Sequence, residues 1–192
     1  MPRVDDRLQI GELMTGWIHR DLGHWDAVRG LFHPDGVIKI PWFEGLASDF
    51  VDAVSQMARE SDLKSKHLIF SPLIVFNKNR AIAETDVMLV NTNAALRLGA
   101  MGQSRFYDRV ERRNGDWKIV HRESFHDMAG FVFPAGPVEV DAELVARHPL
   151  EYSAIAYMLE KSGHPVNGVF ATKGSQAEAL ARTAGETWLA EA

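Results

Sequence analysis

An aspartate stands where the first helical pattern of the sequence predicts an apolar residue. Between residues 8 and 22, apolar side chains recur at helical spacing and form one stripe made of Ile10, Leu13, Met14, Trp17 and Ile18. At about 100° per residue, Asp21 falls near the centre of that stripe. A carboxylate that points into a core is costly unless a partner binds it, so Asp21 predicts a polar site inside an apolar chamber. Two alternatives remain. Asp21 is exposed at the surface, because it lies just before Gly23, where the helix ends, or it caps a helix that begins near residue 24.

His67 and Arg122 are the residues that we pair with Asp21. His67 begins an apolar strand pattern, and Arg122 lies in the second strand of a later hairpin. A buried carboxylate orients an imidazole and stabilises its protonated form, while an arginine supplies a permanent charge for a developing anion or a leaving group. Together the three predict proton-transfer chemistry, provided that the fold brings them into one cavity. The alternative for His67 is a histidine exposed to solvent on its strand, and the alternative for Arg122 is an ion pair at the surface.

No phosphate-binding glycine motif, nucleophile elbow or zinc-binding H-E-x-x-H motif occurs in the sequence. One group of potential metal ligands, His121, Glu123 and His126, lies in a predicted strand. Because side chains of a strand alternate between faces, His121 and Glu123 share one face and His126 points to the other. We therefore expect no metal site and no cofactor.

The element pattern predicts helices first and antiparallel strands afterwards. Helices are expected at about 5–22, 25–32 and 47–59, with a turn at 33–36 and a strand at 37–42. Further strands are expected at 67–76, 81–98, 103–112 and 116–128, the last two joined by Asn114-Gly115, a strong hairpin signal. This order predicts an α+β fold in which one curved sheet wraps around the helices.

The pattern changes after Phe133. A Pro- and Gly-containing stretch at 134–137 precedes weak helical patterns near 141–147, 151–161 and 176–190. We therefore divide the chain into an α+β barrel domain, residues 1–133, and a C-terminal helical extension, residues 134–192. The extension is expected to pack on the barrel or on a neighbouring copy.

Composition limits the classes of function. The chain has 192 residues, 46% of them hydrophobic, a formal net charge of −5 and no cysteine. Scattered basic residues and a negative net charge argue against nucleic-acid binding. The lack of cysteine excludes disulfides and thiolate chemistry and fits a cytoplasmic protein. No signal peptide and no apolar run long enough to span a membrane are visible, so we expect no membrane association.

From about residue 5 to residue 133 the sequence resembles the nuclear transport factor 2-like superfamily, in its SnoaL-like branch. The resemblance is carried, in order, by Asp21 with residues 23–28 and 31–36, and by residues 66–69, 105–108 and 112–119. It implies a cone-shaped α+β barrel with N-terminal helices packed in a curved mixed or antiparallel sheet. The pattern is most similar to hexachlorocyclohexane dehydrochlorinase, scytalone dehydratase and bile-acid 7α-dehydratase. Asp21 and His67 match the catalytic aspartate and histidine of that group, and Arg122 matches the pocket arginine of the dehydrochlorinase.

Two positions depart from the dehydratase pattern. Gly16 and Phe106 stand where tyrosine is common, so phenolic acids for water loss are missing there. Tyr107 replaces them only if it faces inward, which depends on the hairpin. A two-residue turn pairs Tyr107 with Arg122, whereas a three-residue turn with a bulge pairs Phe106 with Arg122. The resemblance favours the second arrangement.

Two functions remain in competition. The first is a cofactor-independent lyase or isomerase that acts on a small, mostly apolar molecule, with His67 as base, Asp21 as its partner and Arg122 steadying the anion. The substrate-binding wall would consist of Trp17, Trp42, Phe50, Met57, Met88 and Phe106. The second is a non-catalytic small-molecule-binding or oligomerisation module of the same fold, in which the cone is filled. In either case the resemblance implies a homo-oligomer, a dimer or a trimer.

Overall fold

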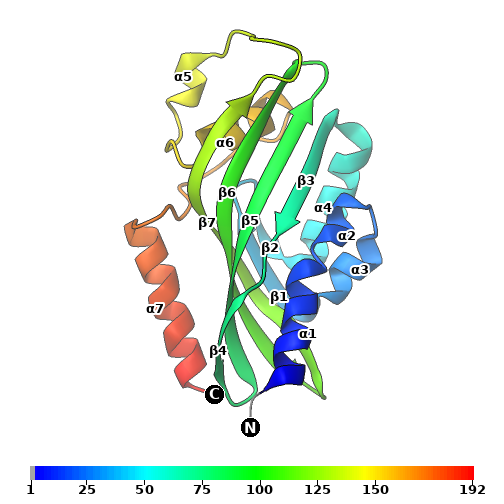
Figure 1. The fold of residues 1–192 in the computed structure, drawn as a ribbon, viewed down its shortest axis with the longest axis vertical. Coiled ribbons are helices and arrows are strands. Elements are labelled where there is room, and N and C mark those ends of the chain that lie inside the picture. Colours follow the sequence, from blue (N-terminus) through cyan, green and yellow to red (C-terminus); the bar gives the residue numbers. More distant parts are fainter. Residues whose placement is uncertain (1–2) are drawn as a thin grey trace.

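The computed structural model describes residues 3–192, which form a curled sheet with helices on both faces (Figure 1). Figure 1 shows the N-terminal helices on one side of the sheet and α7 on the other. The elements are α1 (Val4–Thr15), α2 (Ile18–Asp21), α3 (Trp25–Gly30), β1 (Phe32–Ile40), β2 (Phe43–Leu46), α4 (Ala47–Glu60), β3 (Leu63–Ile69), β4 (Leu73–Asn77), β5 (Arg80–Asn93), β6 (Leu98–Arg113), β7 (Asp116–Val132), α5 (Ala142–Val145), α6 (Ser153–Lys161) and α7 (Gln176–Ala190).

The strands are arranged in the order β2-β1-β7-β6-β5-β3, and β4 pairs with β5. Within the described residues β1 runs parallel to β7, and the other strand pairs are antiparallel. The concave face packs on α1, α3 and α4 through one core cluster that includes Ile10, Val28 and Phe50. The predicted α+β class, with helices packed into a curved mixed sheet, is therefore confirmed. None of the helices in residues 3–192 is long and apolar enough to cross a membrane.

The first helix is shorter than the sequence pattern predicts. It stops at Thr15, and a separate turn of helix, α2, carries Asp21. Gly16 lies at the break against Leu31, where a Cβ atom would be 2.7 Å from the Leu31 Cδ2 atom. The break changes the direction of the stripe, so that Ile18 is exposed whereas the Asp21 side chain is buried.

Several strand predictions need correction. The strand expected at 67–76 is two strands, β3 and β4, and the one expected at 81–98 ends at Asn93. The turn expected at 33–36 belongs to β1, whose pairing with β7 shifts between Phe32 and Val37. The short strand β2 was not predicted. In each case local composition indicated extended chain, but the boundary depends on the partner strand.

The β6–β7 hairpin differs from both predicted arrangements. Its turn has two residues, Asn114 and Gly115, with φ values of 55° and 98°, as a type I′ turn requires. A bulge further along β7 then changes the register, because the partners Val110↔Ile119 are followed by 109↔121. The inward-facing partner of Arg122 is consequently Asp108, not Tyr107 or Phe106.

The C-terminal extension packs on both faces of the sheet. Residues 153–159 of α6 are all buried, in a second core cluster with Leu63 and Ala100. On the opposite face, α7 packs over Tyr107 and Phe125 through Ala177 and Ala181. Gly185 of α7 is in close contact with the Tyr107 ring, since a Cβ atom there would lie 2.5 Å from the Tyr107 Oη atom.

The contact between Gly185 and Tyr107 predicts opposite effects for two glycine substitutions. Alanine favours a helix interior over glycine by about 1 kcal/mol. Gly11→Ala in α1, where nothing lies within 4 Å of the new Cβ, should therefore raise the melting temperature. Gly185→Ala should lower the melting temperature, because overpacking costs about 1–3 kcal/mol. Thermal denaturation followed by circular dichroism measures both, and stabilisation by Gly185→Ala would show that α7 does not dock through this residue.

Candidate active site

The Asp21 carboxylate is buried and binds His67 twice. Its Oδ2 atom accepts a hydrogen bond of 2.6 Å from the backbone N–H of His67, and its Oδ1 atom lies 2.7 Å from the imidazole Nδ1 atom. Only 2% of the Asp21 side chain and 9% of the His67 side chain are exposed. The predicted hydrogen bond between Asp21 and His67 is therefore confirmed. The two residues do not both face the cavity described below, because only His67 is on its wall.

The pKa of Asp21 follows from these contacts. Burial alone would raise the pKa of the carboxyl group, but the hydrogen bonds from His67 outweigh it and hold the pKa below its usual value. The Arg20 guanidinium, whose Nη1 atom lies 3.4 Å from Oδ1, acts in the same direction. Asp21 is consequently an anion at neutral pH and fixes a proton on Nδ1 of His67.

Burial lowers the pKa of the His67 imidazole to about 4, and the hydrogen bond to Asp21 opposes this shift only in part. The positive charges of Arg20 and Arg122 lower the pKa of His67 further. At neutral pH the imidazole is thus uncharged. Because Nδ1 is occupied by Asp21, Nε2 is the nitrogen with a free lone pair, and it suits a base.

A cavity lies beside His67 on the concave side of the sheet. The space between its lining atoms is about 780 Å³, including the part open to solvent. Asp21 is not on the wall of this cavity but lies behind His67. Most of the wall is apolar, and its polar members are Arg20, Ser65, His67, Asn91, Ser104, Ser124 and His126.

Four of the six predicted wall residues line this cavity: Trp17, Trp42, Met57 and Phe106. Trp17 meets the His67 ring edge-on, with ring centroids 6.2 Å apart. Phe50 is fully buried behind the wall, stacked on Trp17 at 5.6 Å. Met88 lies on the other face of the sheet, because its neighbours in β5, Val87 and Leu89, face the cavity and side chains alternate along a strand.

Arg122 is not on the cavity wall but forms a buried ion pair with Asp108. The Arg122 Nε and Nη2 atoms each lie 2.8 Å from a carboxylate oxygen of Asp108, and both side chains are 0% exposed. The guanidinium group also lies 4.1 Å from the Phe106 ring centroid and 4.6 Å from that of Trp17. Its charge is thus largely balanced by Asp108, although the Nη1 atom has no hydrogen-bond partner among the described residues.

The bulge in β7 determines which residues of β7 are opposite Tyr107 and Phe106. Tyr107 pairs with Glu123 and faces the outer side of the sheet, where it stacks on Phe125. Phe106 pairs with Ser124 and faces the cavity. Among residues 3–192 no tyrosine lines the cavity.

Sequence reasoning missed three polar residues of this region. Asp108 alternates with Phe106 and Val110, and a charged residue on an apolar strand face is the same signal that identified Asp21. Arg20 adjoins Asp21 and reaches the cavity. His126 was weighed only as a metal ligand, and it points inward while His121 and Glu123 point outward, as alternation predicted. Among the described residues, no three His, Asp or Glu side chains are grouped as a metal site would need.

Comparison with known proteins gives one sequence match and many structural ones. The sequence model described as a SnoaL-like domain matches residues 2–123. No curated protein matches the sequence. Three of the solved structures with a similar fold, all at low sequence identity, illustrate the likeness.

A candidate scytalone dehydratase from Novosphingobium aromaticivorans has a TM-score of 0.59 at 19% identity, with 71% of this chain and 97% of that chain covered. A hexachlorocyclohexane dehydrochlorinase, LinA-type3 from Novosphingobium barchaimii, has a TM-score of 0.58 at 17% identity, with 72% and 97% covered. A protein of unknown function from Mycobacterium tuberculosis has a TM-score of 0.57 at 18% identity, with 87% and 94% covered.

The buried ion pair predicts unequal effects of removing its two members. Asp108→Asn leaves the guanidinium without a counter-charge, which should cost about 3–5 kcal/mol of unfolding free energy. Arg122→Met should cost less, because burial already raises the pKa of Asp108 and the carboxyl group then takes up a proton. The double variant Asp108→Asn/Arg122→Met should be more stable than the summed effects of the two single changes predict, because neither charge is then left buried without its partner.

Urea denaturation of the four proteins gives this comparison. Asp52→Asn is the matched control, because Asp52 pairs with Arg29 on the surface, where a substitution changes stability by no more than about 0.5 kcal/mol. Simple additivity of the two single changes would show that Asp108 and Arg122 are not energetically coupled.

Burial of His67 predicts that acid destabilises the fold. Because the pKa of His67 is about 4 in the folded protein and about 6.5 in an unfolded chain, the unfolded state binds an extra proton between these values. The contribution of the neutral His67 imidazole to the free energy of unfolding is thus complete above about pH 6.5, and it is lost as the pH falls towards 4. His121 and His126, with pKa values also lowered to about 4 by burial, act in the same direction. Unfolding free energies measured between pH 7.5 and 4.5 should fall less steeply in His67→Gln, and an unchanged slope would contradict this account.

Proposed function

This chain belongs to the SnoaL-like domain family, and from that premise we propose that it is a cofactor-independent lyase or isomerase that acts on a small, mostly apolar molecule. The observation that carries the proposal is the contact between Asp21 and the His67 imidazole beside an apolar cavity. Similar folds occur in a hexachlorocyclohexane dehydrochlorinase and a candidate scytalone dehydratase, which supports this class of reaction.

His67 acts as the general base. Its Nε2 lone pair takes a proton from a carbon atom of the substrate, and Asp21 stabilises the imidazolium that forms. In a lyase, the electron pair of the broken C–H bond forms a C=C bond while a leaving group departs from the adjacent carbon with its own bonding pair. In an isomerase, His67 returns the proton to a different carbon atom. Arg20, on the cavity wall, supplies positive charge for the developing anion.

The composition of the wall favours a leaving group that is stable as an anion. Loss of water needs an acid that protonates the departing oxygen, and no tyrosine among residues 3–192 lines the cavity. A halide or a carboxylate leaves without a proton. Elimination of such a group, or isomerisation, is therefore the preferred reaction. Arg122 does not contact the cavity, and its proposed role is limited to the positive charge that it supplies behind Trp17 and Phe106.

The second candidate function is binding without catalysis. A purely structural module would have a filled cone, whereas the concave side here contains a cavity with a polar base at its wall. A non-catalytic binder has no need for a buried carboxylate that fixes one tautomer of the histidine. The cost of burying Asp21 therefore favours the enzyme.

Substitution of the two residues tests the proposal. His67→Gln and Asp21→Asn should each slow proton abstraction by about 100-fold or more, because general-base catalysis contributes about 10²–10⁴-fold. Suitable assays are chloride release from hexachlorocyclohexane and deuterium uptake by cyclohexanone in D2O, followed by NMR. The wild-type rate should fall as the pH drops through the pKa of His67, about 4. Asp21→Asn should move this acid limb to lower pH, since Asp21 raises the pKa of His67.

Two results would reject the catalytic assignment. The first is full activity in His67→Ala, and the second is loss of wild-type activity on addition of a chelator. Leu150→Ala is the control, because Leu150 is 78% exposed and is not on the cavity wall, so its truncation should leave the rate unchanged.

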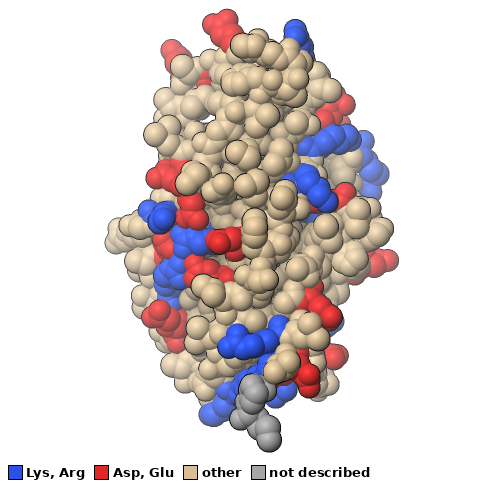
Figure 2. All heavy atoms as spheres, viewed as in Figure 1, with Lys and Arg blue, Asp and Glu red and all other residues tan. Residues whose placement is uncertain are grey.

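We also propose that the protein forms a homo-oligomer through the convex face of its sheet. Figure 2 shows few charged residues over the upper strands of this face. Leu68, Phe70, Met101 and Met128 are 44%, 52%, 40% and 57% exposed there. Register places Leu68, Met88, Gln103 and Met128 side by side across four strands. A contiguous apolar face of this kind is typical of an interface.

Light scattering should therefore give the mass of a dimer or a trimer. Leu68→Lys combined with Met128→Lys should reduce it to the mass of the monomer, because two charges would be buried at the interface. Leu150→Lys, at a residue that is 78% exposed in the extension, is the control and should leave the oligomer intact. A dilute wild-type monomer would contradict the proposal.

A further inference from the structure

Part of the cavity wall comes from the C-terminal extension. Ile155 and Leu159 of α6 line the same cavity as His67, and their spacing of four residues places them on one face of the helix. Leu63 and Leu89 are aliphatic members of the same wall. The cavity therefore combines the polar His67 and Arg20 with an aliphatic surface on α6, while Asn91, Ser104 and His126 add polar groups elsewhere on the wall.

The sheet leaves room for this wall at Gly102. A Cβ atom on Gly102 would lie 3.0 Å from the Ile155 Cγ1 atom and 3.3 Å from its Cδ1 atom. Gly102 itself lines the cavity. The lack of a side chain in β6 at this point lets α6 approach the strand closely and fixes the position of Ile155.

Backbone pairing holds the extension at the edge of β7. The backbone N–H of His126 donates to the Ala171 carbonyl at 2.8 Å, and the N–H of Lys173 donates to the His126 carbonyl at 3.0 Å. The chain thus passes from the concave face, where α6 lies, to the convex face, where α7 lies (Figure 1).

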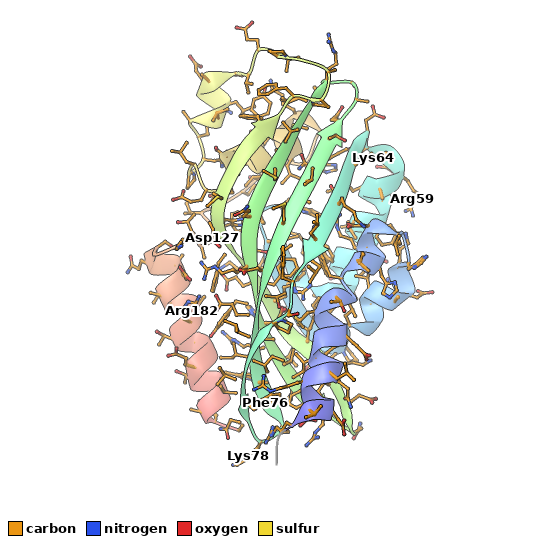
Figure 3. The ribbon with its side chains drawn as sticks, viewed as in Figure 1. Arg59, Lys64, Phe76, Lys78, Asp127 and Arg182 are labelled. Carbon is orange, nitrogen blue, oxygen red and sulfur yellow. The ribbon has the colours of Figure 1, made fainter. Side chains whose placement is uncertain are left out.

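Ion pairs then fasten α7 to the convex face. Arg182 of α7 binds Glu84 of β5 at 2.6 Å, and Glu178 of α7 binds Arg105 of β6 at 2.8 Å. Figure 3 shows Arg182 directed towards the strands. The segment that follows α6 is thus attached to β7 by backbone hydrogen bonds and to the convex face by the ion pairs of α7, and these contacts restrain α6 at the cavity.

The wall formed by α6 lies outside the SnoaL-like match, and the solved structures differ in how much of this chain they cover, up to 87% for the protein from Mycobacterium tuberculosis. The candidate scytalone dehydratase and the LinA-type3 dehydrochlorinase are 97% covered by only 71% and 72% of this chain. The SnoaL-like match likewise ends at residue 123, before α6 begins. The residues of α6 are therefore not part of the sequence that defines the SnoaL-like domain in this chain.

We infer that Ile155 and Leu159 determine which ligand the cavity accepts, by limiting the length of an apolar group whose polar end contacts His67. The inference rests on the proposed function for the placement of the polar end. The ligand class is a ring with one polar substituent at the His67 side and a short aliphatic substituent directed at α6.

The probe is the series from 4-methylphenol to 4-hexylphenol, with binding to the whole protein measured by isothermal titration calorimetry. The phenol O–H donates a hydrogen bond to Nε2 of His67, and the alkyl chain extends towards α6. Affinity for the wild type should rise about four-fold per methylene group until the chain meets Ile155 and Leu159, and then fall. Ile155→Ala and Leu159→Ala should move the tightest binder to a chain one or two carbons longer, and Ile155→Phe should move it to a shorter one.

Controls separate this inference from the proposed function. Leu150→Ala, in the same extension but exposed, should keep the wild-type profile. His67→Gln should weaken every phenol alike without moving the preferred chain length. If His67→Gln binds all phenols as the wild type does, the polar end does not contact His67. The proposed function then fails, while the conclusion that Ile155 and Leu159 limit the chain length stands.

The inference is overturned if the alanine variants keep the wild-type profile, or if the wild type binds none of the phenols. Should an alanine variant unfold, Ile155→Val and Leu159→Val remove less volume, and each should shift the profile in the same direction by a smaller amount.

Discussion

The site depends on one buried carboxylate. Asp21 accepts hydrogen bonds from both the backbone and the side chain of His67, so the same two oxygens attach α2 to β3 and fix the imidazole tautomer. An unpaired carboxylate at this depth would be costly, and the hydrogen bonds that offset the cost also set the geometry of the base. Structure and chemistry are therefore not separable at this residue. The helix break at Gly16, which packs closely against Leu31, comes directly before the helical turn that carries Asp21.

A second buried charge pair separates the cavity from the packed core. Arg122 and Asp108 are fully enclosed, and the aromatic rings of Trp17 and Phe106 cover the guanidinium group. Those two rings are also part of the cavity wall. The pair thus supports the wall from behind. Burial is the main cause of the lowered pKa of His67, and the Arg122 charge adds the smallest of the contributions to that shift. An arginine matched to a family pocket residue does not have to contact the ligand in order to influence the base.

The extension completes the wall of the cavity. The elements before residue 134 supply His67, Arg20 and most of the wall, and α6 supplies Ile155 and Leu159. A chamber of this kind lowers the local dielectric constant and strengthens the electrostatic interactions inside it. The division also lets substrate preference change through α6 while the base stays where the fold requires it.

The sequence alone determined what local periodicity encodes. Asp21 on an apolar helical stripe, the α+β order of elements, the Asn114-Gly115 turn and the opposite faces of His121 and His126 all follow from the spacing of neighbouring residues. Resemblance to the family added the pairing of Asp21 with His67, which no local pattern contains.

Only the tertiary structure decided the features that depend on register and on distant contacts. One extra residue in β7 pairs Arg122 with Asp108, turns Tyr107 outward and leaves Phe106 at the cavity. A bulge has no reliable local signature, because the gain comes from the partners that it aligns. Placement of Ile155 in the cavity likewise depends on Gly102, more than fifty residues earlier, and on the backbone pairing at the edge of β7. The periodicity of α6 shows that it is buried, but what it is buried against is decided by long-range packing.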